Sequence, residues 1–437
     1  MIKKIKSAIK KIYKPELLSA IKWSFIGQII TRLLNICSTI FMARLMLPPG
    51  YGVYSYIIGT LVFFSTIVGL SIRTTSTRNI AVLLKSDKVS FEKYVKVTLV
   101  TGNVLGILGM ILAITFLLIS KDNHVVNLLG FKTLLFSSVA IYTEIFYGLI
   151  LGILGGVTQF KLINILTILS SLFKFLVSYF MFLQWGLRGA IIGWVFVSLL
   201  FVVIAMPILK RSIRNLVSFP LRYSYSDCKK ELKLFLEITL PISIEAGSLL
   251  LSMWFIQTLF LNNEETGKYE LAIFNVANQW KGMALYVPAI LINLLQPFFS
   301  SFQNVEENSE MKTLFLNTRK LVLIISILIT IFLCLFSNTI IDFFGKGYEG
   351  AKEVLLILIF PTVIIGVSNL YRELYISKGK VWIIALNNIV IAIFITLLFL
   401  YLRNLFSLSF AYSIAAGLGE FLLLFLYVLT FKKAKIF

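Results

Sequence analysis

Charged residues, histidine and cysteine are scarce in this sequence, and each scarcity argues against a class of protein. Only 14% of the 437 residues are charged, whereas soluble domains average about 25%. The three cysteines, Cys37, Cys228 and Cys334, lie far apart, which argues against a disulfide framework and against a metal site. The single histidine, His124, falls in a predicted loop, so we expect no histidine chemistry inside a membrane.

Apolar residues fill most of the chain instead. They make up 58% of it, and the mean hydropathy is +0.91. A helix of about 20 residues crosses a bilayer. We therefore expect an all-α polytopic membrane protein with about 12 transmembrane helices, in two six-helix lobes around a central cavity. The expected spans are residues 20–42, 53–72, 96–119, 132–152, 160–183, 189–209, 235–261, 271–298, 320–343, 353–376, 381–402 and 406–430.

The Lys and Arg residues, which give a net charge of +21, gather in alternate loops. The basic stretches are residues 1–22, 73–96, 210–233 and 432–435, whereas residues 262–270 are acidic. This asymmetry follows the positive-inside rule and predicts both termini in the cytoplasm. It also explains the charge as a topology signal and as contact with membrane lipids, so we expect no nucleic-acid partner.

The longest polar stretch, residues 210–233, divides the chain into two halves of six spans each. We expect a cytoplasmic amphipathic and basic segment at 1–19, a first lobe at 20–209, a basic cytoplasmic linker at 210–234, and a second lobe with a basic cytoplasmic tail at 235–437. An even number of spans gives both halves the same orientation, as in parallel repeats. Isoleucines spaced between lysines in Met1–Tyr13 predict an interfacial helix, and the alternative is a disordered basic tail.

Two patterns predict the geometry inside the lobes. Gly156–Asn164 and Gly379–Asn387 share their spacing at an offset of 223 residues, which favours an internal repeat. Pro241, Pro288 and Pro361 lie inside spans, where a proline removes a backbone hydrogen bond and kinks the helix. Bent helices of this kind suit a central cavity.

Two spans carry a lone cation close to the middle of the membrane. Arg32 lies about twelve residues into the first span, and Lys281 about ten residues into the eighth. A charge at that depth costs roughly 2.5–3.5 kcal/mol on insertion scales, so it usually faces a water-filled cavity or a partner. We interpret both as ligands of an anionic substrate. The alternative is a structural ion pair with Glu245.

Polar side chains accompany Lys281 on the same span. Asn275 and Gln279 share one helical face, and Asn278 shares another with Lys281. Together with Trp280, they suit sugar hydroxyls beside a phosphate. Hydrogen bonding between helices is the alternative reading.

The remaining charges in or next to the spans are candidates for substrate capture or ion coupling. Arg73 and Arg78 end the second span at its cytoplasmic mouth, where a topology signal is the alternative. Lys174 and Glu144 differ by about five residues in their distance from the turn between their spans, so pairing between them is weakly predicted. The further substrate candidates are Lys174 and Arg372, and the candidates for coupling a proton or Na⁺ are Glu144, Glu245, Glu373 and Glu420.

Three motifs resemble a known family of membrane proteins. Residues 43–54 read Ala-Arg-Leu-Met-Leu-Pro-Pro-Gly-Tyr-Gly-Val-Tyr, similar to the first-loop signature of polysaccharide and O-antigen flippases. Gly69-Leu70-Ser71, followed by two arginines, resembles the end of that family's second helix. Phe343–Tyr348, with Ala351 and Leu355 after it, resembles the Gly-x-Gly-Tyr element before the tenth helix. Their order and spacing resemble the polysaccharide branch of the multidrug/oligosaccharidyl-lipid/polysaccharide (MOP) exporter superfamily.

This resemblance implies two six-helix lobes in the MOP exporter fold. It implies a flippase in the bacterial cytoplasmic (inner) membrane that moves undecaprenyl-diphosphate-linked oligosaccharide, an O-antigen, lipopolysaccharide or capsular repeat unit, by alternating access. The implied partners are this lipid-linked oligosaccharide and the glycosyltransferases, polymerase and chain-length regulator of the same pathway. We expect no catalytic residues, no metal and no cofactor beyond H⁺ or Na⁺ as a coupling ion.

Two alternatives are open. One is a cation-coupled multidrug exporter of the same superfamily, although such exporters favour acidic cavities. The other is a membrane-embedded polysaccharide polymerase or ligase, which usually carries a large outward loop with catalytic residues. The longest outward loop here, near residues 120–130, offers chiefly Lys121, Asp122 and His124, so we do not expect an enzyme.

The predicted topology can be tested with reporter fusions. Fusions after Lys85 and after Arg222 should report cytoplasm, and a fusion after Asn263 should report the outside, because basic loops are retained in the cytoplasm. An outside signal at Arg222 would contradict the six-plus-six arrangement.

Overall fold

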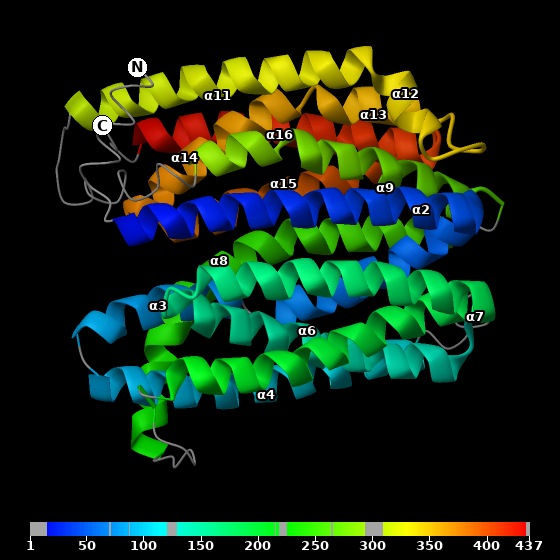
Figure 1. The fold of residues 1–437 in the computed structure, drawn as a ribbon. Helices are drawn as coiled ribbons and strands as arrows, with labels where there is room; N and C mark the ends of the chain where they lie inside the picture. Colours follow the sequence, from blue (N-terminus) through cyan, green and yellow to red (C-terminus); the bar gives the residue numbers. More distant parts are fainter. Residues whose placement is uncertain are drawn as a thin grey trace. The chain divides into compact units, whose positions relative to one another are not determined.

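The computed structural model describes residues 15–69, 71–86, 88–119, 129–214, 216–217, 225–263, 265–292 and 309–433, whose regular secondary structure is helical (Figure 1). The predicted interfacial helix Met1–Tyr13 and the loop that carries His124 lie outside the described residues.

The helices follow the expected spans closely. Eight are long and apolar enough to cross a membrane, or nine if α13 and α14 form one bent span. Helices α2 and α7 each contain two of the expected spans, and α9 supplies the eighth, so about 12 transmembrane helices are confirmed. The helices are α2 (Pro15–Val68), α3 (Ile72–Ser86), α4 (Lys88–Ile119), α6 (Phe131–Gly156), α7 (Phe160–Ile213), α8 (Tyr225–Leu261), α9 (Gly267–Ala284), α11 (Ser309–Leu335), α12 (Ser337–Asp342), α13 (Ala351–Ile359), α14 (Thr362–Ser377), α15 (Val381–Leu402) and α16 (Leu408–Lys433).

Single residues break the two longest helices. Leu47 has φ 58° and ψ 166° in α2, directly before Pro48, whose ring disfavours a helical conformation at the preceding residue. Gly186 has φ 60° in α7, a conformation that glycine adopts without strain. A methyl group on Gly189 would lie 2.0 Å from the Met181 carbonyl oxygen, and Gly193 packs on Ser178. The two parts of α7 therefore run antiparallel, joined by a turn of a few residues.

The described chain forms two compact units that do not follow chain order. The first comprises the residues up to Ser38 and from Phe64 to Thr239, and the second comprises Thr39–Phe63 and the residues from Leu240 onward. Residues 39–63 therefore pack with the second unit, although they precede most of the first in sequence. The first unit ends at Thr239, a few residues beyond the linker expected at 210–234, and the expected lobe boundaries stay predictions.

In the first unit, α6 lies at the centre of a bundle with α3, α4 and α7 (Figure 1). A side-chain carbon at Gly152 would lie 2.7 Å from the Arg73 carbonyl oxygen, so α3 and α6 approach backbone to backbone. Thr77 Oγ1 donates a hydrogen bond of 3.0 Å to the Gly152 carbonyl. Small residues permit such close approach between membrane helices. Phe91 and Ile150 are fully buried in the apolar core of this unit.

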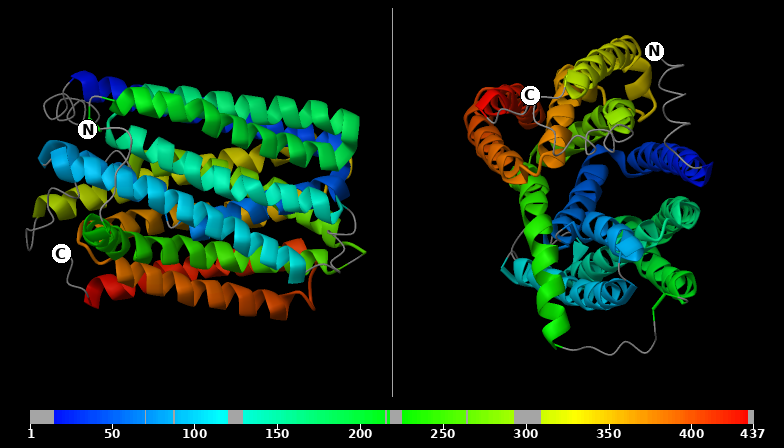
Figure 2. Two further views of the ribbon diagram at one scale, coloured as in Figure 1. Left: turned by 90° about the horizontal axis from the view of Figure 1, so that it is seen from below. Right: turned by 90° about the vertical axis from the view of Figure 1, so that its left-hand side faces the viewer.

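In the second unit, an aromatic cluster joins four helices. Figure 2 shows α11 to α16, coloured from yellow to red, side by side and nearly end-on in its right-hand view. Phe260 of α8 lies 6.3 Å from Phe274 of α9 and 5.8 Å from Phe399 of α15, measured between ring centroids. Tyr412 of α16 lies 4.5 Å from Phe274. Aromatic pairs at these separations add to the stability from burial alone.

Two of the sequence motifs contact one another in the second unit. Arg44 Nε donates a hydrogen bond of 2.6 Å to the Phe343 carbonyl oxygen, and the Tyr348 hydroxyl donates one of 2.9 Å to the Ala43 carbonyl oxygen. The rings of Tyr348 and Tyr51 meet edge to face at 6.4 Å. Gly347, with φ 91°, turns the backbone against the ring of Pro48. The motif residues thus hold the first-loop segment against the turn before α13.

Proline positions account for two helix breaks. Helices α13 and α14 bend by 42° at Pro361. Helix α9 ends at Ala284, and helix resumes at Tyr286 after a turn at Leu285. Because Pro288 has no N–H, it cannot donate to the Ala284 carbonyl four residues earlier. The bend at Pro361 was predicted and is present. Near Pro288, where a bend was also predicted, the helix is interrupted at Leu285. Pro241 lies inside α8, and Pro297 lies outside the described residues.

The turn between α6 and α7 resembles the turn between α14 and α15, but the residues that correspond are not the two glycines that the sequence pattern paired. Gln159 N donates to Leu154 O at 2.9 Å, and Lys380 N donates to Tyr375 O at 2.9 Å, so both turns have the same hydrogen-bond pattern. The residue with positive φ is Thr158 in the first turn and Gly379 in the second. The match of Gly156 with Gly379 was wrong, because backbone conformation rather than residue type defines this turn.

Adding a methyl group at Gly52 should destabilise the second unit. A side-chain carbon there would lie 2.0 Å from the Lys268 carbonyl oxygen at the start of α9, and a backbone atom cannot move aside as a flexible side chain can. Overpacking typically costs about 1–3 kcal/mol, more than the roughly 1 kcal/mol that alanine gains over glycine in a helix. We expect a lower melting temperature for detergent-solubilised Gly52→Ala.

The matched control is Gly148→Ala, since no atom lies within 4 Å of a side-chain carbon at that position. Equal melting temperatures for the two variants would contradict the close contact between α2 and α9.

Candidate functional site

Charged side chains within the spans of the first unit form a compact pair. Lys174 Nζ of α7 lies 2.5 Å from Glu144 Oε1 of α6. Ser198, on the second part of α7, donates a hydrogen bond of 2.8 Å to the same oxygen. The Lys174 ammonium also lies 4.1 Å from the centre of the Trp194 ring, within range of a cation–π interaction. The pair therefore ties α6 to both parts of α7.

The weak prediction for Lys174 and Glu144 misjudged their relative depth. Helix α6 continues to Gly156 instead of ending at residue 152, and the turn to α7 is short. Glu144 therefore lies twelve residues before the end of α6, and Lys174 fourteen residues after the start of α7. A difference of two residues is about 3 Å of helical rise, which a lysine side chain spans easily.

The second unit holds a larger cluster around Arg372 of α14. Its guanidinium contacts both oxygens of Glu245 on α8, with Nε–Oε1 at 2.6 Å and Nη2–Oε2 at 2.8 Å. Nη1 donates a further hydrogen bond of 2.7 Å to Glu373 Oε1. Asn388 of α15 lies 3.4 Å from Glu245 Oε1 through its Nδ2. A bidentate arginine–carboxylate pair is among the strongest polar contacts in proteins, so Arg372 is fully engaged in this conformation.

Lys281 is held less firmly than the other cations of these clusters. Its Nζ lies 3.9 Å from Glu420 Oε1 of α16, which is longer than a hydrogen bond. Its side chain is 16% exposed. The predicted alternative partner, Glu245, is instead occupied by Arg372. Arg32 is half-buried on α2, in the first unit, and its roles as a substrate ligand or as a partner of Glu245 stay predictions.

Of the polar residues before Lys281, Asn275 bonds to other helices, as the following distances show. Asn275 Nδ2 donates a hydrogen bond of 2.9 Å to Ser55 Oγ of α2, and its Oδ1 accepts one of 3.3 Å from Gln257 of α8. Its amide thus joins three helices, as the alternative reading proposed. Asn278 and Gln279 are half-buried on the same helix. Trp280 Nε1 is buried and has no hydrogen-bond partner among the described residues.

Arg73 and Arg78 lie on a separate helix rather than at the end of the second span. Helix α2 ends at Val68, and α3 begins at Ile72. Both arginine side chains are exposed in the first two turns of α3. The prediction that they end the span was wrong because Gly69 and the positive-φ residue Ser71 terminate α2. Their exposure leaves them accessible to an anionic headgroup.

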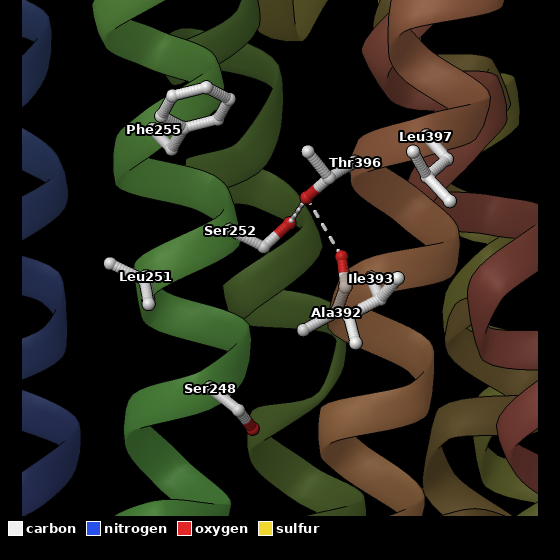
Figure 3. A pocket seen from close by; sticks show the side chains of 8 residues that line it. All are labelled: Ser248, Leu251, Ser252, Phe255, Ala392, Ile393, Thr396 and Leu397. Carbon is white, nitrogen blue, oxygen red and sulfur yellow. Dashed lines mark hydrogen bonds between the residues drawn. The ribbon is translucent and has the colours of Figure 1, made fainter.

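A groove of about 350 Å³ lies between α8 and α15 in the second unit (Figure 3). Leu251, Phe255 and Leu397 line its exposed sides. At its base, the hydroxyls of Ser252 and Thr396 share a hydrogen bond of 2.8 Å. The lining is predominantly apolar, in keeping with a groove between two membrane-spanning helices.

Sequence reasoning missed several members of these clusters. It did not identify Asn388, Gln257, Ser55 or Ser198, although isolated amides and hydroxyls in apolar spans often bond between helices. Among the described residues, no group of three or more His, Cys, Asp or Glu side chains is placed to hold a metal ion.

A comparison with family models identifies the family. Residues 17–303 match the model described as "Polysaccharide biosynthesis protein", which covers more than half of the chain. The chain belongs to this family. Residues 241–402 also match the MatE model. No curated protein matches the chain significantly.

Solved structures with the same fold support this assignment to the MOP superfamily. An inward-facing multidrug resistance MATE transporter has a TM-score of 0.74 at 14% identity, over 93% of this chain and 94% of that one. The lipid II flippase MurJ in an inward closed conformation has a TM-score of 0.73 at 14% identity, over 94% and 87%. A MOP transporter from Pyrococcus furiosus, described as having a binding pocket of reversed polarity, has a TM-score of 0.69 at 16% identity, over 96% and 95%.

These comparisons and the apolar helices establish a multi-pass membrane protein with the MOP exporter fold. The protein is a transporter or flippase of the MOP superfamily, as its sequence motifs predicted.

Removing one member of the Lys174–Glu144 pair should destabilise the first unit. Glu144→Gln leaves the ammonium without its counterion in a partly buried site, and a lost partner of this kind costs roughly 1–3 kcal/mol or more. We expect lower thermal stability for Glu144→Gln and for Lys174→Met, and recovery of most of the loss in the double variant. Additive losses in the double variant would show that the two side chains do not stabilise one another.

Proposed function

We propose that the protein translocates a polyprenyl-diphosphate-linked oligosaccharide, an O-antigen or capsular repeat unit on undecaprenyl diphosphate, across the bacterial cytoplasmic membrane. The match to the polysaccharide biosynthesis family carries this proposal. The matched residues, 17–303, include both proposed phosphate ligands, Arg32 and Lys281. The fold shared with the lipid II flippase MurJ supports transport of a lipid-linked cargo.

Lys281 is the best-placed ligand for the diphosphate. Arg372 and Lys174 make hydrogen bonds with carboxylates at 2.5–2.8 Å, whereas the Lys281 ammonium lies 3.9 Å from Glu420. A diphosphate that enters a low-dielectric cavity must gain a cationic partner, or its desolvation stops transport. Arg32, in the first unit, would supply a second cation with a guanidinium fork that suits two phosphate oxygens.

The remaining parts of the proposal follow from this role. Arg73 and Arg78 would attract the anionic headgroup from the cytoplasm, while Asn278, Gln279 and Trp280 would contact its sugars. The protein would be a non-enzymatic carrier with both termini in the cytoplasm, serving the glycosyltransferases, polymerase and chain-length regulator of one pathway.

A cation-coupled multidrug exporter is the second candidate function. The MatE match over residues 241–402 and the likeness to MATE transporters favour it. The charge clusters described in the second unit contain three carboxylates, Glu245, Glu373 and Glu420, and two cations, Arg372 and Lys281. Deleting such an exporter should raise sensitivity to cationic drugs and leave surface polysaccharide intact, and deleting the proposed flippase should do the reverse.

Replacing the two proposed phosphate ligands tests the function directly. Arg32→Ala or Lys281→Ala should reduce surface polysaccharide at least tenfold in a flippase-null strain, with normal amounts of protein in the membrane. Arg32→Lys should retain part of the activity if charge alone is needed. The controls are Arg403→Ala and Lys346→Ala, which remove exposed cations at loop positions.

A second variant separates binding from structure at Lys281. Because Lys281→Ala leaves Glu420 without its neighbouring cation, Lys281→Ala/Glu420→Gln should restore any lost protein without restoring polysaccharide. Full polysaccharide in this double variant would assign Lys281 a structural role and contradict the proposed site.

A further inference from the structure

Leu47 holds a backbone conformation that is almost restricted to glycine. Its φ of 58° and ψ of 166° lie in a region that other residues occupy only where the surrounding structure imposes it. The break in α7 has a similar conformation, with φ 60° and ψ −146°, and there the residue is Gly186. The chain therefore carries a strained leucine at one break and an unstrained glycine at the other.

The side chain of Leu47 does not compensate for this strain. It is 61% exposed, whereas its neighbours Met42, Ala43 and Met46 are buried. A side chain that removes so little apolar surface from its surroundings adds little stability. The conformation of Leu47 is therefore imposed by contacts of the residues on either side of it.

Before Leu47, two hydrogen bonds hold the backbone of the first-loop segment, and we call them the latch. The Tyr348 hydroxyl donates a hydrogen bond of 2.9 Å to the Ala43 carbonyl oxygen, and Arg44 Nε donates one of 2.6 Å to the Phe343 carbonyl oxygen. Ala43 and Tyr348 are fully buried. Losing their bond without a change of conformation would leave a buried polar group without a partner.

After Leu47, the chain is held by proline and by close packing. Pro48 and Pro49 have φ fixed by their rings, and a side-chain carbon at Gly347 would lie 3.0 Å from Pro48 Cγ. In the facing turn, Gly345 and Gly347 have φ 88° and 91°, which glycine adopts without steric cost. The facing turn is thus relaxed, and the strain of this contact is concentrated at Leu47.

The latch lies in the part of α2 that changes unit. Residues 39–63 pack with the second unit, and the chain before and after them, up to Ser38 and from Phe64, belongs to the first. Conformational changes are absorbed by a few residues that undergo large φ/ψ changes. A segment that packs with one unit and continues into the other is placed to take part in such a change.

We propose that Leu47 stores backbone strain that opposes the latch, so that residues 39–63 are released from the rest of the second unit during transport. The latch favours the bound conformation of this segment, and the strain at Leu47 favours its release. Two opposed contributions keep the two conformations close in free energy, so that both are populated. This role concerns conformation alone and holds for either candidate cargo.

Cysteine labelling at position 53 measures the release directly. Val53 is 2% exposed, so Val53→Cys should react with a maleimide only after the segment has left its contacts. The full-length protein in lipid nanodiscs, with Cys37, Cys228 and Cys334 replaced by serine, provides the background. At maleimide concentrations where the rate is first order in reagent, closing outpaces labelling, and the rate follows the population of the released conformation.

Variants that change the strain in opposite directions should change this rate in opposite directions. Leu47→Gly should slow labelling at least fivefold, because glycine adopts the observed conformation without strain. Leu47→Val should accelerate labelling by a similar factor, because a β-branched residue tolerates positive φ least. Tyr348→Phe removes one latch bond, keeps the ring beside Tyr51, and should also accelerate labelling.

Two further variants separate strain from general destabilisation. Leu47→Gly/Tyr348→Phe should label at about the rate of the parent Val53→Cys protein, because the two changes have opposite signs. Gly186→Leu is the matched control in the first unit, where a side-chain carbon meets no atom within 4 Å. It adds strain without a clash, and should lower the melting temperature without changing the labelling rate.

An unchanged or faster labelling rate in Leu47→Gly would overturn the proposal, even if its melting temperature rises, since a purely structural role predicts that result. Leu47→Gly is expected to fold at least as well as the parent, so the decision does not depend on Leu47→Val. The assay contains no cargo. Normal polysaccharide export by Lys281 variants would therefore contradict the proposed cargo and leave the role of Leu47 intact.

Discussion

Neutralising charge inside a membrane is the constraint on which this structure depends. Lys174 joins the two parts of α7 to α6 through Glu144, and Arg372 joins α14 to α8 through Glu245. Lys281 and Glu420 link α9 to α16 more loosely. Each contact connects helices that belong to one unit. Because an unpaired charge in hydrocarbon is expensive, these contacts constrain the register of the helices as well as their proximity.

The same constraint shapes how an anion could be carried. A diphosphate can bind only where it gains a cation, and most cations of the described spans already have a carboxylate partner. Binding at Lys281 would therefore compete with Glu420, and the displaced carboxylate would need a proton or another counterion.

Much of the fold was predictable from the sequence because hydropathy and proline act locally. The spans, the bend at Pro361 and the break near Pro288 were all expected. The exact end of α6 was not, since helix ends depend on a few backbone conformations. The pairing of Lys174 with Glu144 was underestimated for this reason: four more residues of α6 bring the two to similar depths.

It was harder to predict which charged residues pair with one another than to identify the charged residues of the site. All four carboxylates and the cations of the clusters were identified from their positions in apolar spans. The pairing of Glu245 was not, because Glu245 meets Arg372 through packing of helices more than a hundred residues apart. The motifs at 43–54 and 343–348 were both recognised, yet their mutual contact through Arg44 and Tyr348 follows only from tertiary structure.

The central claim is that the cargo is a polyprenyl diphosphate bearing sugars. Reconstituting the purified protein in liposomes with a fluorescent polyprenyl-diphosphate oligosaccharide, and measuring the fraction accessible to an added glycosidase, tests it most directly. The account predicts that the protein moves the labelled lipid between leaflets and that Lys281→Ala does not. Unchanged lipid accessibility, together with proton-driven uptake of a cationic dye, would contradict it and establish a drug exporter.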